Sequence, residues 1–255
     1  LVHRIGMGAR GWDIGMSAYS NLVLATSGLV SYWRLGEPSG SVVDSKSAHN
    51  GTVTGATYGQ TGLLTGDSDK ALLYDADGDK VVIADHADFA LTTGLTIEAW
   101  VSLDSFASGR AIFARRQAGG NGGYYMAASN SDGIEVACSL SGAGFQATEA
   151  TGFTVGPVFH VVGTFDGAFL RIYKNGVQAA FNVQDWTGFP ISTPASTITE
   201  IGYQTVGGTS WRGVIDEVAI YNVALSPTTI AAHYALGHNG PGSVRLAQQF
   251  QLRPY

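Results

Sequence analysis

Ten short apolar segments, each bounded by turn residues, restrict this chain to a β-sheet fold. Apolar and polar side chains tend to alternate within them, which indicates strands because successive side chains of a strand point to opposite faces. The connecting segments contain Gly, Asn or Asp, residues that tolerate the positive φ angles of tight turns. The predicted strands cover residues 71–75, 80–84, 95–103, 110–116, 123–129, 133–140, 158–165, 169–176, 199–204 and 213–222.

Composition supports a turn-rich all-β domain with a sizeable core. The chain has 35 glycines in 255 residues, about twice the usual frequency of about 7%. Charged residues make up 13%, against about 25% in typical domains, while 45% of residues are hydrophobic. These values favour one large β domain over a helical or disordered chain.

Charge and cysteine content argue against several classes of partner. The net charge is −6 and no run of Lys or Arg forms a basic stripe, so no nucleic-acid partner is expected. Cys138 is the only cysteine, which rules out a disulfide within the chain. No apolar run approaches about 18 residues, so no membrane span is expected.

The clearest local unit is the segment of residues 164–183. Asp166-Gly167 and Asn175-Gly176 are dipeptides that favour two-residue hairpin turns. They flank an alternating stretch at residues 168–174, so the segment predicts three consecutive antiparallel strands.

One helix is predicted near the end of the chain. Ser226 is a suitable N-cap, Pro227 suits the first helical position, and Gly237 is expected just past the last turn. About ten residues make too short a helix to be stable alone, so it must pack on the sheets.

The two ends of the chain lack the sustained periodicity of the middle. We therefore predict an N-terminal arm at 1–21, a single domain at 22–237 and a C-terminal arm at 238–255. The arms are either disordered termini or extended segments that become ordered against neighbouring chains.

A series of motifs follows one order along residues 22–237: Tyr32-Trp33-Arg34-Leu35, the Asn50-Gly51 turn, 70–75, Val81-Val82, 95–101, 159–176, 199–204 and 213–227. The series resembles the laminin G-like, concanavalin A-like jelly-roll domains. The resemblance implies an all-β, concanavalin A-like jelly-roll sandwich of two antiparallel sheets with one short C-terminal helix.

The same resemblance implies a binding or adhesion role for glycans or proteins. Residues 19–40 are similar to the form of this domain in bacterial surface proteins and bacteriophage tail or other virion proteins. We therefore expect a non-enzymatic bacteriophage virion component on the particle surface, in a homo-oligomer or symmetric assembly. Its arms, 1–21 and 238–255, would attach it to other virion or surface proteins, and the jelly roll would bind host-surface glycan. The alternative is a secreted or cell-surface carbohydrate-binding module, calcium-dependent and lectin-like.

A cluster of carboxylates is the candidate metal site. Asp75, Asp77 and Asp79 occupy alternate positions, an oxygen-rich set suited to Ca²⁺. The loop is not an EF-hand, and structural calcium is common in the family it resembles. Asp216 on the last strand is a fourth candidate ligand. The alternative is a solvated turn whose Asp side chains cap backbone amides, and residues 66–69 indicate a plain turn of this kind.

No catalytic constellation is recognised. Strict alternation would place Asp216 and Glu217 on opposite faces of their strand, which prevents the facing carboxylate pair of glycosidases. Glu217 is then expected to be hydrogen-bonded or solvent-facing. Glu98 and Glu135 have no carboxylate at the next same-face position of their strands. We expect no enzymatic activity.

Aromatic and cationic residues provide candidates for glycan contacts, because sugar sites combine apolar surface with a few polar groups. The candidate ligand-binding residues are Arg115 with its neighbour Arg116, Tyr124, Tyr125, Tyr203 and Trp211. Other large aromatics are predicted to lie in the core instead, namely Trp33, Trp100, Phe113, Phe159 and Phe165.

Overall fold

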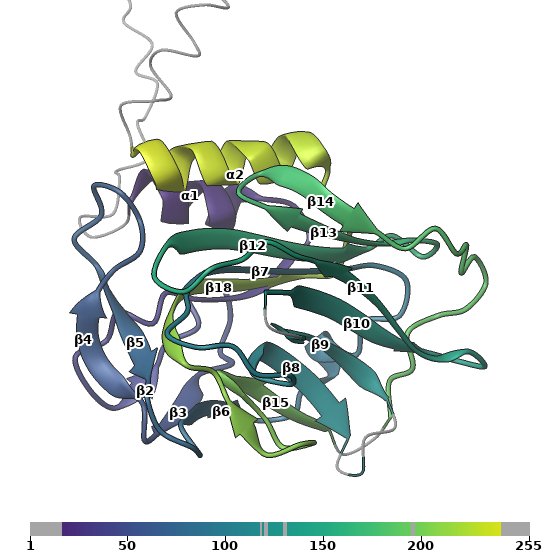
Figure 1. Ribbon diagram of the computed structural model, residues 1–255, viewed down its shortest axis with the longest axis horizontal. Coiled ribbons are helices and arrows are strands. Elements are labelled where there is room, and N and C mark those ends of the chain that lie inside the picture. Colours follow the sequence, from purple (N-terminus) through teal and green to yellow (C-terminus); the bar gives the residue numbers. More distant parts are fainter. Residues whose placement is uncertain (1–16, 118, 120–121, 130–131, 195–196, 241–255) are drawn as a thin grey trace, which may run out of the picture.

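The structure, a computed structural model, describes residues 17–117, 119, 122–129, 132–194 and 197–240. Two antiparallel sheets of eight strands pack face to face, and two helices cover one outer side (Figure 1). All ten predicted strands are present, and the all-β sandwich is confirmed.

Sheet A has the strand order β14-β13-β12-β7-β18-β5-β4, and β1 also pairs with β18. Its strands are β1 (Leu29–Trp33), β4 (Thr57–Thr61), β5 (Lys70–Tyr74), β7 (Leu95–Ser102), β12 (Val158–Phe165), β13 (Leu170–Lys174), β14 (Val177–Phe181) and β18 (Gly213–Tyr221).

Sheet B has the order β11-β10-β9-β8-β15-β6-β3-β2. Its strands are β2 (Ser41–Val42), β3 (Gly51–Thr54), β6 (Lys80–Ile83), β8 (Ala111–Gln117), β9 (Gly123–Ala128), β10 (Ile134–Leu140), β11 (Gly144–Ala150) and β15 (Thr197–Ile201). A small hairpin, β16 (Tyr203–Gln204) and β17 (Thr209–Ser210), follows β15, and a 3₁₀ turn, η1 (Ala87–Phe89), precedes β7.

The predicted run of three antiparallel strands is confirmed as β12, β13 and β14. Asn175 and Gly176 have φ angles of 52° and 77°, and the two-residue turn of this hairpin needs positive φ at both positions.

The main core lies between the two sheets. Four of the five aromatics predicted to be core residues, Trp33, Phe113, Phe159 and Phe165, lie there and are at most 6% exposed. The fifth, Trp100, is equally buried but lies on the other side of sheet A, beneath the helices. The sheets approach closely where Gly163 of β12 meets Val136 of β10. A Cβ atom at position 163 would lie 2.6 Å from Val136 Cβ, so only glycine fits between the sheets there.

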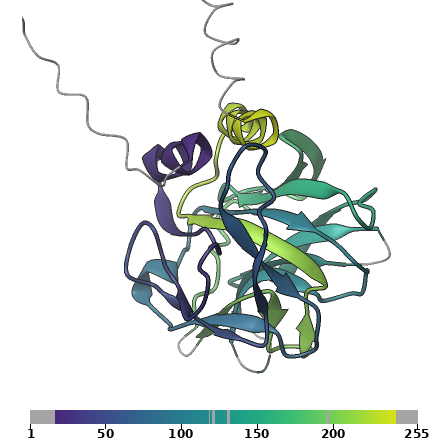
Figure 2. The ribbon, with the colours of Figure 1, turned by 90° about the vertical axis from the view of Figure 1, so that its left-hand side faces the viewer.

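Two helices cover the outer face of sheet A. The helix α1 (Ala18–Ala25) was not predicted, and α2 (Pro227–Asn239) contains the predicted N-cap and first-turn proline. Figures 1 and 2 show the two helices next to each other on this side of the molecule. Their apolar side chains form a second cluster with the outward-facing aromatics of the sheet: Tyr19, Val23, Ile230 and Leu236 with Trp100, Tyr173 and Tyr221.

The predicted end of α2 at Gly237 is wrong. The helix continues to Asn239, and Gly240, with a φ of 70°, caps it. Gly237 lies inside the helix, at a position where a Cβ atom would be 2.3 Å from Trp100 Cζ2. This glycine therefore allows the helix to approach the sheet.

The predicted domain limits also need correction. Tyr19 is 2% exposed and packs edge-on against Trp100, so the folded region starts before residue 22. At the other end, α2 passes the expected limit at residue 237.

A buried ionic network joins both helices to sheet A. Glu98 Oε1 lies 2.8 Å from His160 Nε2 and 2.9 Å from His233 Nδ1, and it accepts a hydrogen bond from the Tyr19 hydroxyl. The Tyr221 hydroxyl donates to Glu98 Oε2. Burial opposes ionisation of Glu98, but His233 and His160 nonetheless hold its pKa well below the usual range. We interpret this network as structural, because Glu98, His160 and His233 are fully buried.

Candidate functional site

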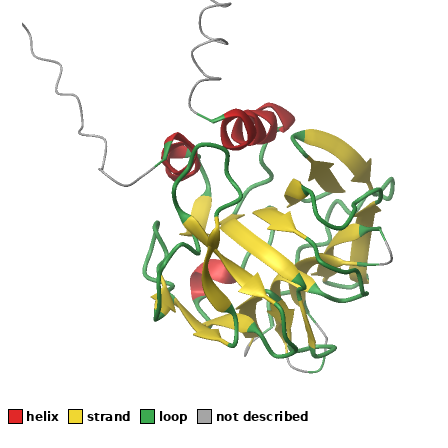
Figure 3. Ribbon diagram, turned by 60° about the vertical axis from the view of Figure 1, so that its left-hand side comes forward, coloured by secondary structure: helices red, strands yellow, loops and turns green. Residues whose placement is uncertain are grey.

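The two outer faces of the sandwich differ. The outer face of sheet A lies beneath α1 and α2. Figure 3 shows both of these helices at the same end of the molecule, away from the outer face of sheet B. In the part of the chain that the structure describes, no α-helix packs on strands β8 to β11 of that face.

Tyr125 lies on this face within a row of small residues. Its partners across the sheet are Ala114 on β8 and Ala137 on β10, and Ala147 on β11 continues the row. Directly opposed side chains of neighbouring strands are in contact distance. The alanines therefore leave the half-buried ring of Tyr125 standing above its neighbours on both sides.

Arg116 crosses the face beside Tyr125. Its guanidinium carbon lies 5.0 Å from the centre of the Tyr125 ring and 4.6 Å from that of Phe145 on β11. The register explains this reach, because Arg116 faces Gly123 and Phe145 faces Ser139, so only small side chains lie between them. The two rings are 6.0 Å apart with an interplanar angle of 46°.

Two carboxylates border the aromatic pair. Glu135 on β10 lies directly opposite Glu149 on β11, and its Oε1 accepts a hydrogen bond of 3.0 Å from the Tyr125 hydroxyl. Burial and repulsion from Glu149 raise the pKa of Glu135, whereas Tyr125 and Arg116 oppose that rise. We define Arg116, Tyr125, Glu135 and Phe145 as the outer-face cluster.

Only part of the predicted glycan-contact set is accessible. Tyr125 and Tyr203 are half-buried, and Lys80 Nζ lies 4.8 Å from the centre of the Tyr203 ring. The other three candidates belong to the interior, because Arg115, Tyr124 and Trp211 are each 3% exposed or less.

Each interior candidate has a structural partner. Arg115 Nη2 lies 3.2 Å from Asp85 Oδ1. Tyr124 donates its hydroxyl hydrogen bond to Phe89 O, and Trp211 Nε1 donates to Ser102 O. The structure therefore does not offer these three side chains to a ligand.

The predicted calcium ligands do not converge. Asp79 Oδ2 accepts hydrogen bonds from the amides of Asp75 and Ala76, at 2.9 Å and 2.7 Å, and Asp77 pairs with Arg212. This is the capped turn considered as the alternative. Among the described residues, the four carboxylates Asp75, Asp77, Asp79 and Asp216 form no group with donor atoms within 4.8 Å of one another. Calcium binding stays a prediction.

The strict alternation predicted for β18 is wrong. Glu217 has a φ of 53°, and the pairing of β18 with β7 shifts register between Asp216 and Ala219, which is a β-bulge. Asp216 and Glu217 are 1% and 0% exposed. Neither side chain can reach a substrate. The expectation that these two residues are not a catalytic pair therefore holds, but the reason is burial and not strand alternation.

Glu217 is fixed by the first strand. It accepts a hydrogen bond from the Tyr32 hydroxyl, and Arg34 Nε lies 3.5 Å from its Oε1. Burial raises the pKa of Glu217 well above its usual range. Of the two positions expected for this residue, the hydrogen-bonded one is confirmed, and the solvent-facing one is excluded because Glu217 is 0% exposed.

Arg34 also changes the interpretation of residues 66–69. It pairs with Asp67 at 3.2 Å and with Asp69 at 2.7 Å, so the segment is a paired loop and not a plain turn. Asp216 lies beside this loop, where its Oδ2 accepts a hydrogen bond of 2.7 Å from Leu63 N–H. Burial raises the pKa of Asp216 to about 8.

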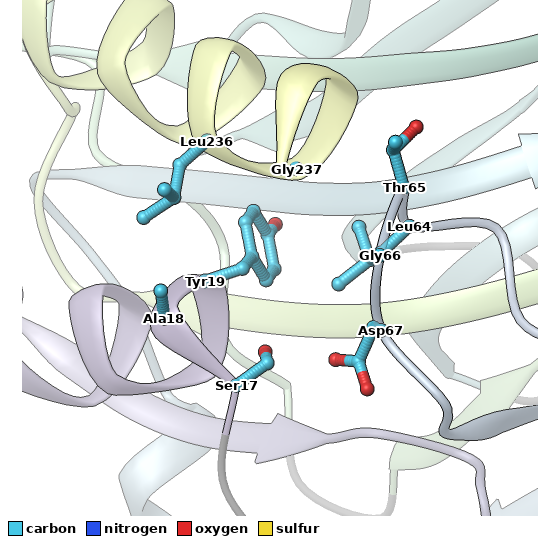
Figure 4. Close-up of a pocket in the computed structure, with 9 residues that line it drawn as sticks. All are labelled: Ser17, Ala18, Tyr19, Leu64, Thr65, Gly66, Asp67, Leu236 and Gly237. Atoms are coloured by element: carbon cyan, nitrogen blue, oxygen red, sulfur yellow. The ribbon is translucent and has the colours of Figure 1, made fainter. Parts of the chain in front are cut away.

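Figure 4 shows a small cavity where both helices meet the loop between β4 and β5. Its volume of about 80 Å³ is well below the roughly 300 Å³ of small ligand pockets. The residues that line it are Ser17, Ala18, Tyr19, Leu64, Thr65, Gly66, Asp67, Leu236 and Gly237.

The predicted arms mostly lie outside the described residues, which begin at Ser17 and end at Gly240. Their proposed attachment to other proteins therefore stays a prediction. No helix in the described ranges is long and apolar enough to cross a membrane.

A family model described as the concanavalin A-like lectin/glucanases superfamily, of laminin G type, matches residues 75–231. A search of curated proteins found no matching sequence.

Several solved structures share the fold. Trypanosoma rangeli sialidase superposes with a TM-score of 0.63 and 18% identity over 84% of this chain, which spans only 33% of the sialidase. Domain 4 of AbnA, a GH43 extracellular arabinanase from Geobacillus stearothermophilus, was solved in complex with arabinotriose. It superposes with a TM-score of 0.59 and 19% sequence identity, over 81% of this chain and 98% of that domain. The binding domain of Paraclostridial Mosquitocidal Protein 1 superposes with a TM-score of 0.60 and 12% sequence identity, over 82% of this chain and 52% of that one. At such identities the likeness shows the fold alone.

Proposed function

This chain belongs to the concanavalin A-like lectin/glucanase superfamily, and on that premise we propose that it is a non-enzymatic carbohydrate-binding module. Its binding site is the outer-face cluster of sheet B, with the sugar lying on Tyr125 and Phe145.

The observation that carries the proposal is the pairing of two half-buried rings with one guanidinium and one carboxylate. Aromatic rings offer apolar surface to the C–H face of a sugar, and carboxylates accept hydrogen bonds from its hydroxyls. The flanking residues Ala114, Ala137 and Ala147 have only methyl side chains, and Ala147 is exposed on this face.

Two structural relatives support this choice. The match with domain 4 of the arabinanase extends over nearly the whole of that domain, which was solved in complex with arabinotriose. The mosquitocidal protein uses the fold as a binding domain. Arabinotriose is therefore a sensible first ligand, followed by a broad glycan array.

The test is a glycan array, then calorimetric titration of the strongest ligand with wild type, Tyr125→Ala and the control Tyr58→Ala. Tyr58 is a half-buried tyrosine on β4 of the other sheet. We expect Tyr125→Ala to weaken binding by about tenfold or more, in line with the loss of an aromatic contact in a binding hot spot. An array without ligands, or equal losses in both variants, would overturn the proposal. A parallel array with EDTA tests the predicted calcium dependence.

A second candidate function is glycoside hydrolysis by Glu135 and Glu149. These residues lie directly opposite each other, and burial raises the pKa of Glu135, as suits a general acid. Hydrolysis of arabino-oligosaccharides that is lost in both Glu135→Gln and Glu149→Gln would favour this function. Binding without turnover favours the module.

We place the module on the outside of a bacteriophage particle, with the surface of a cell as the alternative. The support is the similarity of residues 19–40 to virion proteins of this type. Mass spectrometry of purified particles, with the copy number per particle, tests the placement and the proposed symmetric assembly.

A further inference from the structure

Three side chains from two neighbouring loops form a cluster that the glycan site does not use. His49 precedes β3, while His86 and Asp88 lie at the start of η1, before β7. We propose that His49, His86 and Asp88 bind one late first-row transition metal ion, with Zn²⁺ as the representative.

The distances suit a shared ligand. Asp88 Oδ2 lies 3.4 Å from His49 Nε2 and 3.4 Å from His86 Nδ1. Metal–ligand distances of about 2.0–2.2 Å place two donors of a tetrahedral zinc site about 3.3 Å apart. The three donor atoms lie within 4.8 Å of one another, so rotation of the exposed His86 and Asp88 side chains suffices to close the set.

His49 is held in the orientation that a metal ligand needs. Its Nδ1 lies 3.2 Å from Asp44 Oδ2 and 2.8 Å from Ser31 Oγ. A carboxylate only accepts hydrogen bonds, so Nδ1 carries the proton and Nε2 presents its lone pair towards Asp88. Asp44 is 3% exposed, and it accepts further hydrogen bonds from the amides of Tyr32 and Lys46.

The surrounding rings fix the position of His49 further. Its ring centre lies 4.8 Å from that of Phe89 and 4.5 Å from that of His86. The Trp33 indole donates a hydrogen bond to the carbonyl oxygen of His49. The ligand on the buried side is therefore rigid, while the two on the solvent side are free to adjust.

The donor set selects the class of metal. Two imidazoles and one carboxylate suit Zn²⁺ and its neighbours, whereas Ca²⁺ and Mg²⁺ prefer oxygen ligands. Three protein ligands also leave positions for water or for a donor from another molecule. This site is separate from the four predicted calcium residues and from the outer-face cluster.

The experiment titrates the full chain, stripped by a chelator, with ZnCl₂ and separately with CaCl₂ by calorimetry. The variants are His86→Asn and Asp88→Ala. His86 Nδ1 accepts the hydrogen bond of Asp88 N–H at the start of η1. Asparagine keeps an acceptor at this N-cap and removes the imidazole. His238→Ala, on the exposed side of α2, is the matched control.

We expect one Zn²⁺ per wild-type chain and no binding of Ca²⁺ at these side chains. His86→Asn and Asp88→Ala should each weaken Zn²⁺ binding by about tenfold or more. Loss of a residue that only hydrogen-bonds a metal ligand already weakens binding by about tenfold, and these two residues are the ligands themselves. Zn²⁺ should also raise the melting temperature of wild type and of the control, and at the same concentration it should raise that of His86→Asn by clearly less. No Zn²⁺ binding, unchanged affinity in both site variants, or an equal loss in His238→Ala would overturn the proposal. None of these results depends on whether a glycan binds.

Discussion

Replacing Asp216 with asparagine is expected to stabilise the folded chain by an amount that grows as the pH rises. The carboxyl is 1% exposed, and burial raises its pKa from 3.8 to about 8. In the unfolded chain this group ionises near pH 4. Between the two values the folded chain keeps a proton that the unfolded chain releases, so wild-type stability falls as the pH increases.

The magnitude follows from the width of that window. Each pH unit between the unfolded and folded pKa values removes about 1.4 kcal/mol of unfolding free energy. From 3.8 to pH 7 the loss from this one group is about 4 kcal/mol. The side-chain amide introduced by Asp216→Asn is neutral at every pH and could still accept the Leu63 N–H bond. The variant should therefore match wild type near pH 4 and exceed it at neutral pH.

Urea unfolding, followed by tryptophan fluorescence at intervals from about pH 4.5 to about pH 8, measures the unfolding free energy of the variant and of wild type. The difference between them is then known across the window between the two pKa values. Asp77→Asn is the control, since this carboxylate is 83% exposed. Parallel stability curves for wild type and Asp216→Asn would refute the reasoning, because the buried carboxyl would then not hold its proton. A variant that is less stable at every pH would refute it too.

Three further substitutions test the packing and the buried network. Glu98→Gln should lower the unfolding free energy by about 3–5 kcal/mol near pH 6, because His233 and the other partners of Glu98 lose a buried charge. This cost should shrink as the pH falls through the lowered pKa of Glu98, and a loss independent of pH would contradict the prediction. Gly163→Ala should cost about 1–3 kcal/mol through overlap with Val136, with partial recovery in the double variant that carries Val136→Ala; a neutral single variant would speak against the close approach of the sheets. Gly237→Ala should destabilise by a similar amount because its methyl group meets Trp100, and unchanged urea midpoints would contradict that contact.

Much of the sandwich could be predicted from local patterns. Alternation and turn dipeptides identified ten strands, because the period of two and the positive φ of Asn175-Gly176 are properties of the segment itself. Short or polar strands such as β2 and β11 carry no comparable pattern. They exist because neighbouring strands pair with them.

The errors arise where distant residues decide the geometry. Nothing near Glu217 indicates a bulge, which is accompanied by contacts with Tyr32 and Arg34 about 180 residues away in sequence. Gly237 has the pattern of a helix end, but its role is set by Trp100 of another element.

The candidate site shows the same limit. Tyr125 was predicted from its residue type, whereas Glu135 and Phe145 join it only through the register of β9, β10 and β11. Arg115 and Arg116 were named together, and only Arg116 contacts the rings. The sequence could not separate them, because a register shift in β8 between Ala111 and Phe113 obscures which residues face outward.

The most direct test of the proposed function is an NMR titration of the ¹⁵N-labelled chain with arabinotriose or the strongest glycan from the array. The account predicts that the amide shifts concentrate on β8 to β11, around Arg116, Tyr125, Glu135 and Phe145, and that Tyr125→Ala needs about tenfold or more ligand to produce them. Shifts confined to the helices or to sheet A, or a saturating glycan that leaves these strands unchanged, would contradict it.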